Sequence, residues 1–474
     1  MGNPKAFLSI DRKEAGYRPI NERKYDFGEV EQTLNSEDRK LQASRCMDCG
    51  VPFCHWACPL GNINPEWQNL LYKGLIREAA ELLQSTNNFP EFTGRICPAL
   101  CENACVLNHS INLAVTCREN EAAVIEHAFN EGYIIPMPPK KRTGKNIAVI
   151  GGGPSGMAAA DQLNKSGHTV VLFEKNEAVG GLLRFGIPDF KLNKKVIDRR
   201  LNILKAEGIT FKTGVKVGID YPTEKIFSNF DAICLCLGAE QARDLPIEGR
   251  DLEGVHFALE LLQQQNRIIS GKHIDSNNFL TAHGKRVLVI GGGDTGSDCV
   301  GTSIRQGAKS VTQIEIMPMP PERENSATPW PNWPNILRTS SSQQEGCERR
   351  WCLTTNKFIG KNGKLTAVEV EEVEWLPSPD GGRAIMNKTG KIETLEVELV
   401  LLSMGFTQPK HEGLLNEMGL KYDERGNVAT NANQQTSIPK VFAAGDVNTG
   451  SSLVVRAIAA GRKAAAEIDK FLIK

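Results

Sequence analysis

The sequence predicts an α/β protein in which an amino-terminal all-α domain precedes two doubly wound, Rossmann-like domains. A strand, a glycine-rich turn and a helix follow one another from Asn146, and the same succession returns 140 residues later. That succession is typical of the opening of a doubly wound sheet. Eight of the 13 cysteines lie between Cys46 and Cys117, around a stretch with helical apolar spacing from Glu66 to Leu83. The start of the chain is therefore expected to be a separate helical domain.

Length and composition divide the chain into three domains. Its 474 residues suit that number at about 100–200 residues per domain. The proline-rich basic stretch Pro136–Gly144 marks a boundary. We predict a helical domain over residues 1–140, a first doubly wound domain from residues 145–240 and 405–474, and a second over residues 241–404.

The charge balance and the hydropathy argue against two classes of partner. Lys plus Arg and Asp plus Glu both number 56, so nothing favours nucleic acid or an anionic membrane surface. No apolar run reaches the roughly 18 residues that a membrane-spanning helix needs, and Met1–Ile10 lacks the pattern of a signal peptide. We expect a cytoplasmic protein with no nucleic-acid and no membrane partner.

The first glycine-rich turn has the spacing of a dinucleotide-binding fingerprint. Gly151 permits a tight turn, Gly153 lets the backbone approach a pyrophosphate, and Gly156 allows close packing of the helix. The amino terminus of that helix then faces the phosphates. Glu174 stands 23 residues after Gly151, where an acid accepts hydrogen bonds from ribose hydroxyls. Because strand, turn, helix and acid all agree, a dinucleotide site is predicted here.

The second turn repeats the spacing with Gly291, Gly293, Asp294 and Gly296. Two such folds predict two dinucleotides, a tightly held flavin and a nicotinamide coenzyme that binds and leaves. Glu315 lies at the end of the next predicted strand. An acid there favours a free 2′-hydroxyl and hence NADH, whereas a 2′-phosphate favours arginine. Because Glu315 could equally face solvent, NADPH and NADH both stay open.

Two further segments are assigned to the flavin. Gly445 and Asp446 precede a predicted helix and resemble the second flavin fingerprint of two-dinucleotide flavoprotein reductases, where the Asp meets the ribityl chain or a phosphate. Gly181 and Arg184 lie in a glycine-rich segment that we expect along the flavin, with a plain connecting loop as the alternative. No catalytic acid or base is predicted, because hydride transfer from nicotinamide to flavin depends on orientation.

Seven cysteines form two runs with metal-ligand spacing. Thiolates on such loops can surround iron–sulfur clusters, and a proline directly after Cys58 and Cys97 is typical of ferredoxin-like runs. Zinc is the alternative, although zinc sites usually pair two short spacings around a longer gap. Structural free thiols are a further alternative. The first run is Cys46, Cys49, Cys54 and Cys58, and the second is Cys97, Cys101 and Cys105.

The order of these motifs resembles the small (beta) subunit of glutamate synthase. The resemblance extends to Phe185–Pro188, Glu315–Pro321, Pro329–Pro334, Leu402–Phe406 and Val454–Ala457, and covers essentially the whole chain. The reductase half of dihydropyrimidine dehydrogenase shares this architecture. The resemblance implies an electron-input subunit with FAD and two [4Fe–4S] clusters that oxidises NADPH or NADH. Its partner would be a large (alpha) subunit that makes glutamate from glutamine and 2-oxoglutarate.

The resemblance also implies how the clusters are held. Four ligands of one cluster would be Cys46, Cys49, Cys54 and Cys105, and three of the other Cys58, Cys97 and Cys101. Cys117 and Glu121 are candidates for the eighth ligand, because a helix would place them at i and i+4 on one face. Thiolate chemistry favours Cys117, whereas the resemblance favours Glu121, which we adopt.

Two other functions stay open from the sequence. A reductase of the same architecture could feed ferredoxin or another catalytic chain. A zinc-stabilised binding protein could carry a vestigial dinucleotide fold. Colour and spectrum would separate the zinc protein, and co-purification with a large glutamine-amidotransferase chain would separate the other reductase.

Overall fold

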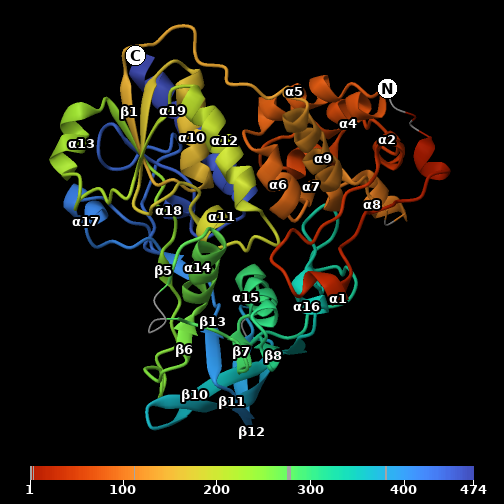
Figure 1. Ribbon diagram of the computed structural model, residues 1–474, viewed down its shortest axis with the longest axis vertical. Coiled ribbons are helices and arrows are strands. Elements are labelled where there is room, and N and C mark those ends of the chain that lie inside the picture. The colour runs from red at the N-terminus through yellow and green to blue at the C-terminus, as the bar shows by residue number, and fades with distance from the viewer. Residues whose placement is uncertain (1–2, 4, 112, 275–278, 379–381, 474) are drawn as a thin grey trace.

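The computed structural model describes residues 3, 5–111, 113–274, 279–378 and 382–473. Figure 1 shows a group of helices from the amino-terminal part of the chain beside two sheets, one at the top and one at the bottom of the view. The helices of the first group are η1 (Ala6–Leu8), α1 (Ile20–Arg23), α2 (Ser36–Ser44), α3 (Phe53–Ala57), α4 (Asn64–Tyr72), α5 (Ile76–Thr86), α6 (Pro90–Ile96), α7 (Leu100–Asn103), α8 (Val106–Ile111) and α9 (Cys117–Asn130).

The amino-terminal helices pack around an apolar core that includes Trp67, Leu83 and Val124. The helix expected from Glu66 to Leu83 is in fact two helices, α4 and α5. They separate at Gly74, which adopts a φ of +77° that glycine favours and that ends the first helix. A helix, α9, does place Cys117 and Glu121 one turn apart.

The first parallel sheet has the strand order β15-β4-β1-β2-β3. Its strands are β1 (Asn146–Ile150), β2 (Thr169–Glu174), β3 (Thr210–Thr213), β4 (Ala232–Leu235) and β15 (Val441–Ala443). The helices that accompany it are α10 (Pro154–Lys165), α11 (Leu182–Phe185), α12 (Lys194–Ala206), α13 (Thr223–Asn229), α17 (Leu414–Met418), α18 (Asp446–Thr449) and α19 (Val454–Ile473).

Both faces of this sheet are covered, as the apolar strands require. Ile147 and Val149 of β1 join one core with residues of α10 and α19, while Ala148 and Ile150 join another core on the opposite face. Figure 1 shows α10, α12 and α19 on the side of the helical group and α13 and α17 on the far side. Strands buried on both faces are typical of parallel sheets.

The second parallel sheet has the strand order β6-β13-β7-β8-β9. Its elements are β6 (Val255–Phe257), α14 (Ala258–Ile269), β7 (Arg286–Ile290), α15 (Asp294–Arg305), β8 (Ser310–Ile314), α16 (Ser341–Gln344), β9 (Glu348–Arg350) and β13 (Leu399–Leu402). Val287 and Val289 of β7 pack with α14 and α15 on one face. The fold class predicted from the two glycine-rich turns is confirmed.

A three-stranded antiparallel sheet covers the other face of the second sheet. It consists of β10 (Leu353–Lys361), β11 (Lys364–Leu376) and β12 (Ile385–Glu396). Val368 and Val370 of β11 share a core with Leu288 and Ile290 of β7. Two short strands, β5 (Gln241–Ala242) and β14 (Phe406–Gln408), pair where the chain passes between the two parallel sheets.

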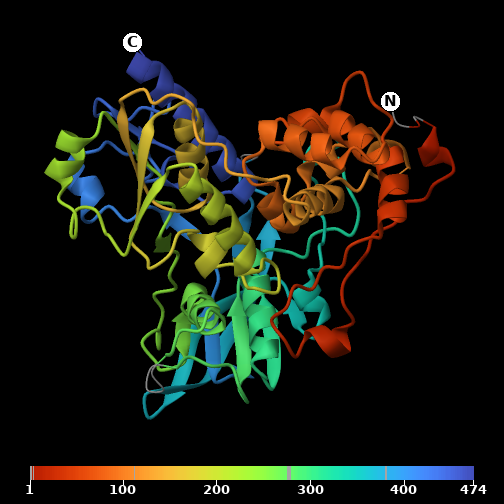
Figure 2. The same ribbon diagram turned by 45° about the horizontal axis from the view of Figure 1, so that its top comes forward.

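The segment that carries α1 runs from the helical group to the second parallel sheet. Figure 2 shows it descending to α16. There Glu345, whose side chain is fully buried, accepts from Arg23 at 2.8 Å and from Arg305 of α15 at 2.5 Å. The backbone N–H of Val30 donates to Phe190 of the first doubly wound domain at 3.0 Å. One segment therefore touches all three parts of the molecule.

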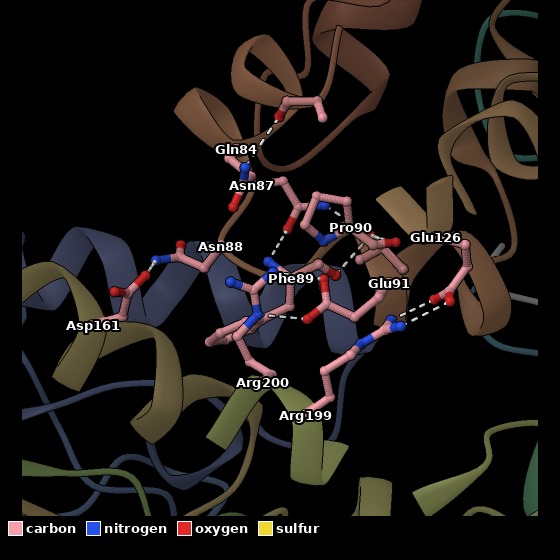
Figure 3. A network of polar contacts seen from close by, with 12 residues as sticks. Gln84, Asn87, Asn88, Phe89, Pro90, Glu91, Glu126, Asp161, Arg199 and Arg200 are labelled. Atoms are coloured by element: carbon pink, nitrogen blue, oxygen red, sulfur yellow. Dashed lines mark hydrogen bonds and ion pairs between the residues drawn. The ribbon is translucent and has the colours of Figure 1, made fainter. Parts of the chain in front are cut away.

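A polar network joins the helical group to the helices of the first sheet. Asn88 donates to Asp161 of α10, and Arg462 of α19 donates to Asn88 at 2.7 Å. Arg199 of α12 pairs with Glu126 of α9 through two bonds of 2.6 and 2.9 Å (Figure 3). None of the described helices is long and apolar enough to cross a bilayer.

Candidate cofactor sites

The first glycine-rich turn joins β1 to α10, and close contacts within the protein require glycine at two of its three fingerprint positions. Gly151 has a φ of +109°, and a Cβ there would overlap the carbonyl oxygen of Cys236. A Cβ on Gly156 would overlap the carbonyl oxygen of Gly151, so α10 approaches the turn only with glycine at this position. A Cβ on Gly153 would meet no protein atom within 4 Å. The turn is therefore open to a ligand at Gly153.

The acid predicted for this site lies against the turn. Oε2 of Glu174 accepts from the backbone N–H of Gly152 at 2.8 Å. Oε1 accepts from the backbone N–H and the side-chain amide of Asn176, at 2.8 and 2.7 Å. These three bonds hold a buried carboxylate at the end of β2, beside the turn, where a dinucleotide ribose would lie.

The glycine-rich segment before α11 packs on the same turn. Gly181 has a φ of +51°, and a Cβ there would lie 2.7 Å from the Cα of Gly153. The N–H of Gly180 donates to the carbonyl of Gly152 at 2.8 Å. Arg184 is buried and uses its guanidinium within the protein, donating to the carbonyl of Val179 at 2.7 Å and pairing with Asp198. The segment thus lies at the turn, with Arg184 bracing it.

The second predicted flavin segment reaches the turn from the carboxyl-terminal part of the chain. Gly445 has a φ of +82°, and a Cβ there would lie 2.8 Å from the Cβ of Ser155 in the first turn of α10. Asp446 begins α18, and its Oδ1 accepts from the hydroxyl of Ser452 at 2.8 Å. Burial, the main cause, raises the pKa of Asp446 to about 6. Three segments distant in sequence therefore meet at one edge of the first sheet.

The second glycine-rich turn, between β7 and α15, repeats the first. Gly291 has a φ of +120°, and a Cβ there would overlap the carbonyl oxygen of Ser403. A Cβ on Gly296 would overlap the carbonyl oxygen of Gly291, and one on Gly293 would meet nothing within 4 Å. Asp294 is the first residue of α15. The structure thus places two turns of the same build at the edges of two sheets.

The thiols of the first cysteine set surround one cavity in the helical domain. Burial, the main cause, raises the pKa of Cys46 to about 12. It also raises the pKa of Cys54 and of Cys105. A buried thiolate therefore needs a cationic partner here. The cavity is lined by Cys46, Met47, Cys49, Pro52, Phe53, Cys54, Asn64, Pro65, Gln68, Cys105, Val106, Leu107, Val115 and Cys117.

The second set has a buried carboxylate among its neighbours. Burial raises the pKa of Cys58 and Cys97 to about 12, and the charge of Glu121 acts on both thiols in the same direction. Glu121 is 8% exposed and accepts from Asn87 at 3.1 Å, from Asn62 at 3.4 Å and from Thr93. Burial, the largest cause, raises the pKa of Glu121 to about 7 against these hydrogen bonds.

Cys117, the other candidate ligand, begins α9, one turn before Glu121. Its thiol contacts that of Cys101, which belongs to the second set, and it also lines the cavity of the first set. Sequence reasoning did not identify Asn62, Asn87 and Thr93 as partners of Glu121. Their polarity is common on surfaces, and only the fold shows that Asn62, Asn87 and Thr93 are buried.

The donor set fits iron–sulfur clusters. Four thiols around one cavity and three more beside a buried carboxylate supply the soft ligands that such clusters need. Among the residues that the structure describes, no three His, Cys, Asp or Glu side chains meet closely enough to hold a single metal ion. The clusters would draw the buried thiols into the thiolate form.

Comparison with known proteins gives the family. The model of pyridine nucleotide-disulphide oxidoreductases matches residues 145–461, and that of dihydropyrimidine dehydrogenase domain II with its 4Fe-4S cluster matches residues 23–133. A Mycobacterium tuberculosis protein named glutamate synthase (NADPH) small chain is 48% identical, covering 100% of this chain and 96% of its own. The chain belongs to the glutamate synthase small-chain family. The resemblance seen in the order of the motifs is confirmed.

Other relatives of the family differ in chain length and in the coenzyme of their names. The Bacillus subtilis glutamate synthase (NADPH) small chain is 40% identical over 100% of this chain and 99% of its own. The Saccharomyces cerevisiae glutamate synthase (NADH) is 41% identical over 99% of this chain but only 22% of its own. Among solved structures, Mycobacterium tuberculosis FprA in complex with NADPH shares the fold. The TM-score is 0.54, the identity is 19%, and the match covers 69% of this chain and 84% of that one.

Proposed function

We propose that this chain is the electron-input subunit of glutamate synthase. It oxidises NADPH or NADH through FAD and two [4Fe–4S] clusters and supplies a large (alpha) subunit, which makes glutamate from glutamine and 2-oxoglutarate. The observation that carries the proposal is that one chain contains both two glycine-rich turns of the same build and two sets of half-buried thiols. The match to small chains along their full length supports it.

Each part of the chain has one task in this proposal. Residues 1–140 hold the clusters, residues 145–240 with 405–474 hold FAD, and residues 241–404 bind the nicotinamide coenzyme. FAD supplies the chemistry that divides a hydride into single electrons. The protein supplies orientation, because no titratable side chain has to donate or accept a proton for hydride transfer.

The flavin would be held by the three segments that meet at the first sheet. Gly153 and the amino terminus of α10 would face the pyrophosphate, Glu174 a ribose, and Asp446 the ribityl chain. Gly181 keeps the adjoining segment close to the turn, because a larger residue would collide with Gly153. Arg184 would act indirectly, by bracing that segment.

The clusters would be held by the ligands implied by the family. Cys46, Cys49, Cys54 and Cys105 would hold one cluster, and Cys58, Cys97, Cys101 and Glu121 the other. Cys97 directly follows α6. Phe92, near the start of that helix, packs in the same core as Met157 of α10. The second cluster would then lie on the side of the helical domain that faces α10, which suits a relay from flavin to partner.

The test uses the purified chain alone and with its partner. Alone, it should contain FAD, iron and sulfide and should oxidise reduced nicotinamide with ferricyanide, yet make no glutamate. Added large subunit should restore glutamate formation from glutamine and 2-oxoglutarate. A colourless protein that binds zinc, or a chain that makes glutamate alone, would overturn the proposal. Reduction of ferredoxin without any response to the large subunit would assign it to another reductase class.

A further inference from the structure

The end of β8 carries a carboxylate that is anchored on the second glycine-rich turn. Oε2 of Glu315 accepts from the backbone N–H of Gly292 at 2.6 Å, and Oε1 accepts from the N–H of Met317 at 3.2 Å. A Cβ on Gly292 would lie 2.8 Å from that Oε2. The glycine thus leaves room for the carboxylate, and the two N–H groups fix where its charge lies.

This arrangement repeats the one in the first doubly wound domain. Glu174 accepts from Gly152 at 2.8 Å and from the N–H two residues after itself at 2.8 Å. A Cβ on Gly152 would also lie 2.8 Å from the carboxylate oxygen. Glu174 has the side-chain amide of Asn176 as a third donor, whereas Glu315 has no such third donor among the described residues. Glu315 therefore keeps acceptor capacity for a ligand.

No cation of the described residues neutralises Glu315. Within the described ranges no Lys, Arg or His nitrogen comes within 4.0 Å of its carboxylate. Arg350 is a basic residue on the backbone paired with Glu315, because the carbonyl of Arg350 accepts from the N–H of Glu315. The Arg350 guanidinium instead pairs with Glu393 of β12 at 2.5 Å. The residues directly after Glu315 are Ile316, Met317, Pro318 and Met319, none of them basic.

We propose that Glu315 makes the chain specific for NADH over NADPH. Its free acceptor sites receive the hydroxyls of the adenine ribose, and its uncompensated charge repels the 2′-phosphate that distinguishes NADPH. This inference depends on the proposed function, which assigns the second turn to the nicotinamide coenzyme. Membership of the family leaves the choice open, because its relatives are named for either coenzyme.

The test measures binding apart from electron transfer. Calorimetry on the purified holoprotein should show 5′-AMP binding at least about tenfold more tightly than adenosine 2′,5′-bisphosphate. With ferricyanide as acceptor, kcat/KM for NADH should exceed that for NADPH by a similar factor or more. Glu315→Gln should reduce both ratios by about tenfold, and Glu315→Arg should reverse them. Glu348→Gln removes an exposed carboxylate from the neighbouring β9 and should leave both ratios unchanged.

The outcomes separate this proposal from the proposed function. Tighter binding of the 2′-phosphorylated ligand by the unaltered chain, equal binding of the two, or binding of neither, would overturn the assignment of Glu315. So would ratios that Glu315→Gln leaves unchanged. Preference for 5′-AMP in a chain that does not respond to the large subunit would support Glu315 and overturn the proposed function.

Discussion

Glu91 and Arg200 form a buried, two-bond ion pair between the helical domain and the first doubly wound domain. Nε and Nη2 of Arg200 donate to the two carboxylate oxygens of Glu91 at 2.6 and 3.0 Å (Figure 3). The side chain of Arg200 is 6% exposed and that of Glu91 is 0% exposed. The guanidinium also lies over the ring of Phe129. The pair fixes α6, which Cys97 directly follows, against α12.

Removal of one partner of this pair should weaken the junction strongly. Arg200→Met leaves the Glu91 carboxylate buried without its cation, which costs about 3–5 kcal/mol. We expect a clear fall in the midpoint of thermal unfolding, partly recovered when Glu91→Leu is added. Arg77→Met, in an exposed pair with Glu81, should cost only about 0.3–0.5 kcal/mol. Equal effects of the two single changes would contradict this account.

Alanine at the open glycine of each turn should identify which cofactor that turn serves. Gly153→Ala and Gly293→Ala collide with no protein atom and place a methyl group only where a ligand approaches. Gly153→Ala should release FAD, seen as loss of the flavin absorbance. Gly293→Ala should retain FAD and raise the KM for the coenzyme by about tenfold or more. Exchanged results would reverse the assignment of the two folds.

The eighth cluster ligand can be decided by counting iron. Glu121→Ala should lose one of two clusters, about four irons of eight, with the matching signal of the reduced protein. Cys117→Ala should keep both clusters, because Glu121 would already complete the second set of four ligands with Cys58, Cys97 and Cys101. Full iron in Glu121→Ala together with loss in Cys117→Ala would show that Cys117 is the ligand.

The affinity for FAD should depend on pH through Asp446. In the flavin-free protein burial raises its pKa to about 6. Hydrogen bonds from ribityl hydroxyls would favour the carboxylate and lower that pKa, so binding should tighten as the pH rises from 5 to about 6 and level off above. We expect about tenfold weaker binding at pH 5 than at pH 7. Fluorescence of released FAD measures it.

Two variants check the origin of this dependence. Asp446→Asn should bind FAD with an affinity that is flat over the same pH interval. Asp251→Asn, in an exposed turn of the second doubly wound domain, should keep the dependence of the unaltered chain. Affinity that falls as the pH rises would place Asp446 beside a phosphate instead, because a carboxylate and a phosphate repel each other.

Local sequence patterns were sufficient to predict the elements that depend on neighbouring residues alone. The strand β1 begins at Asn146 and β7 begins 140 residues later, as predicted, because each is a short apolar run that a glycine-rich turn ends. The helix expected from Glu66 to Leu83 was wrong in one respect, since periodicity does not show that Gly74 takes a positive φ. The antiparallel sheet of β10–β12 was not predicted, because it depends on pairing between strands.

The candidate site was likewise predicted where local spacing determines it and missed where it depends on the fold. The spacing of the glycines and cysteines pointed to residues that the structure gathers at two sheet edges and around one cavity. The partners of Glu121 and the anchoring of Glu315 on Gly292 depend on which side chains the fold buries and where it directs them. Neither follows from composition or spacing.

The bond between Arg23 and Glu345 has a consequence for how the chain is made. These residues are 322 positions apart, so at about 5–20 residues per second Arg23 leaves the ribosome roughly 15–60 s before its partner. Throughout that interval Arg23 lacks its buried carboxylate partner, although Val30 of the same segment can already bond to Phe190. The ion pair can form only after Glu345 has been translated. A fragment cut after the helical domain would keep the seven cysteines of the two runs but would leave Arg23 permanently without Glu345.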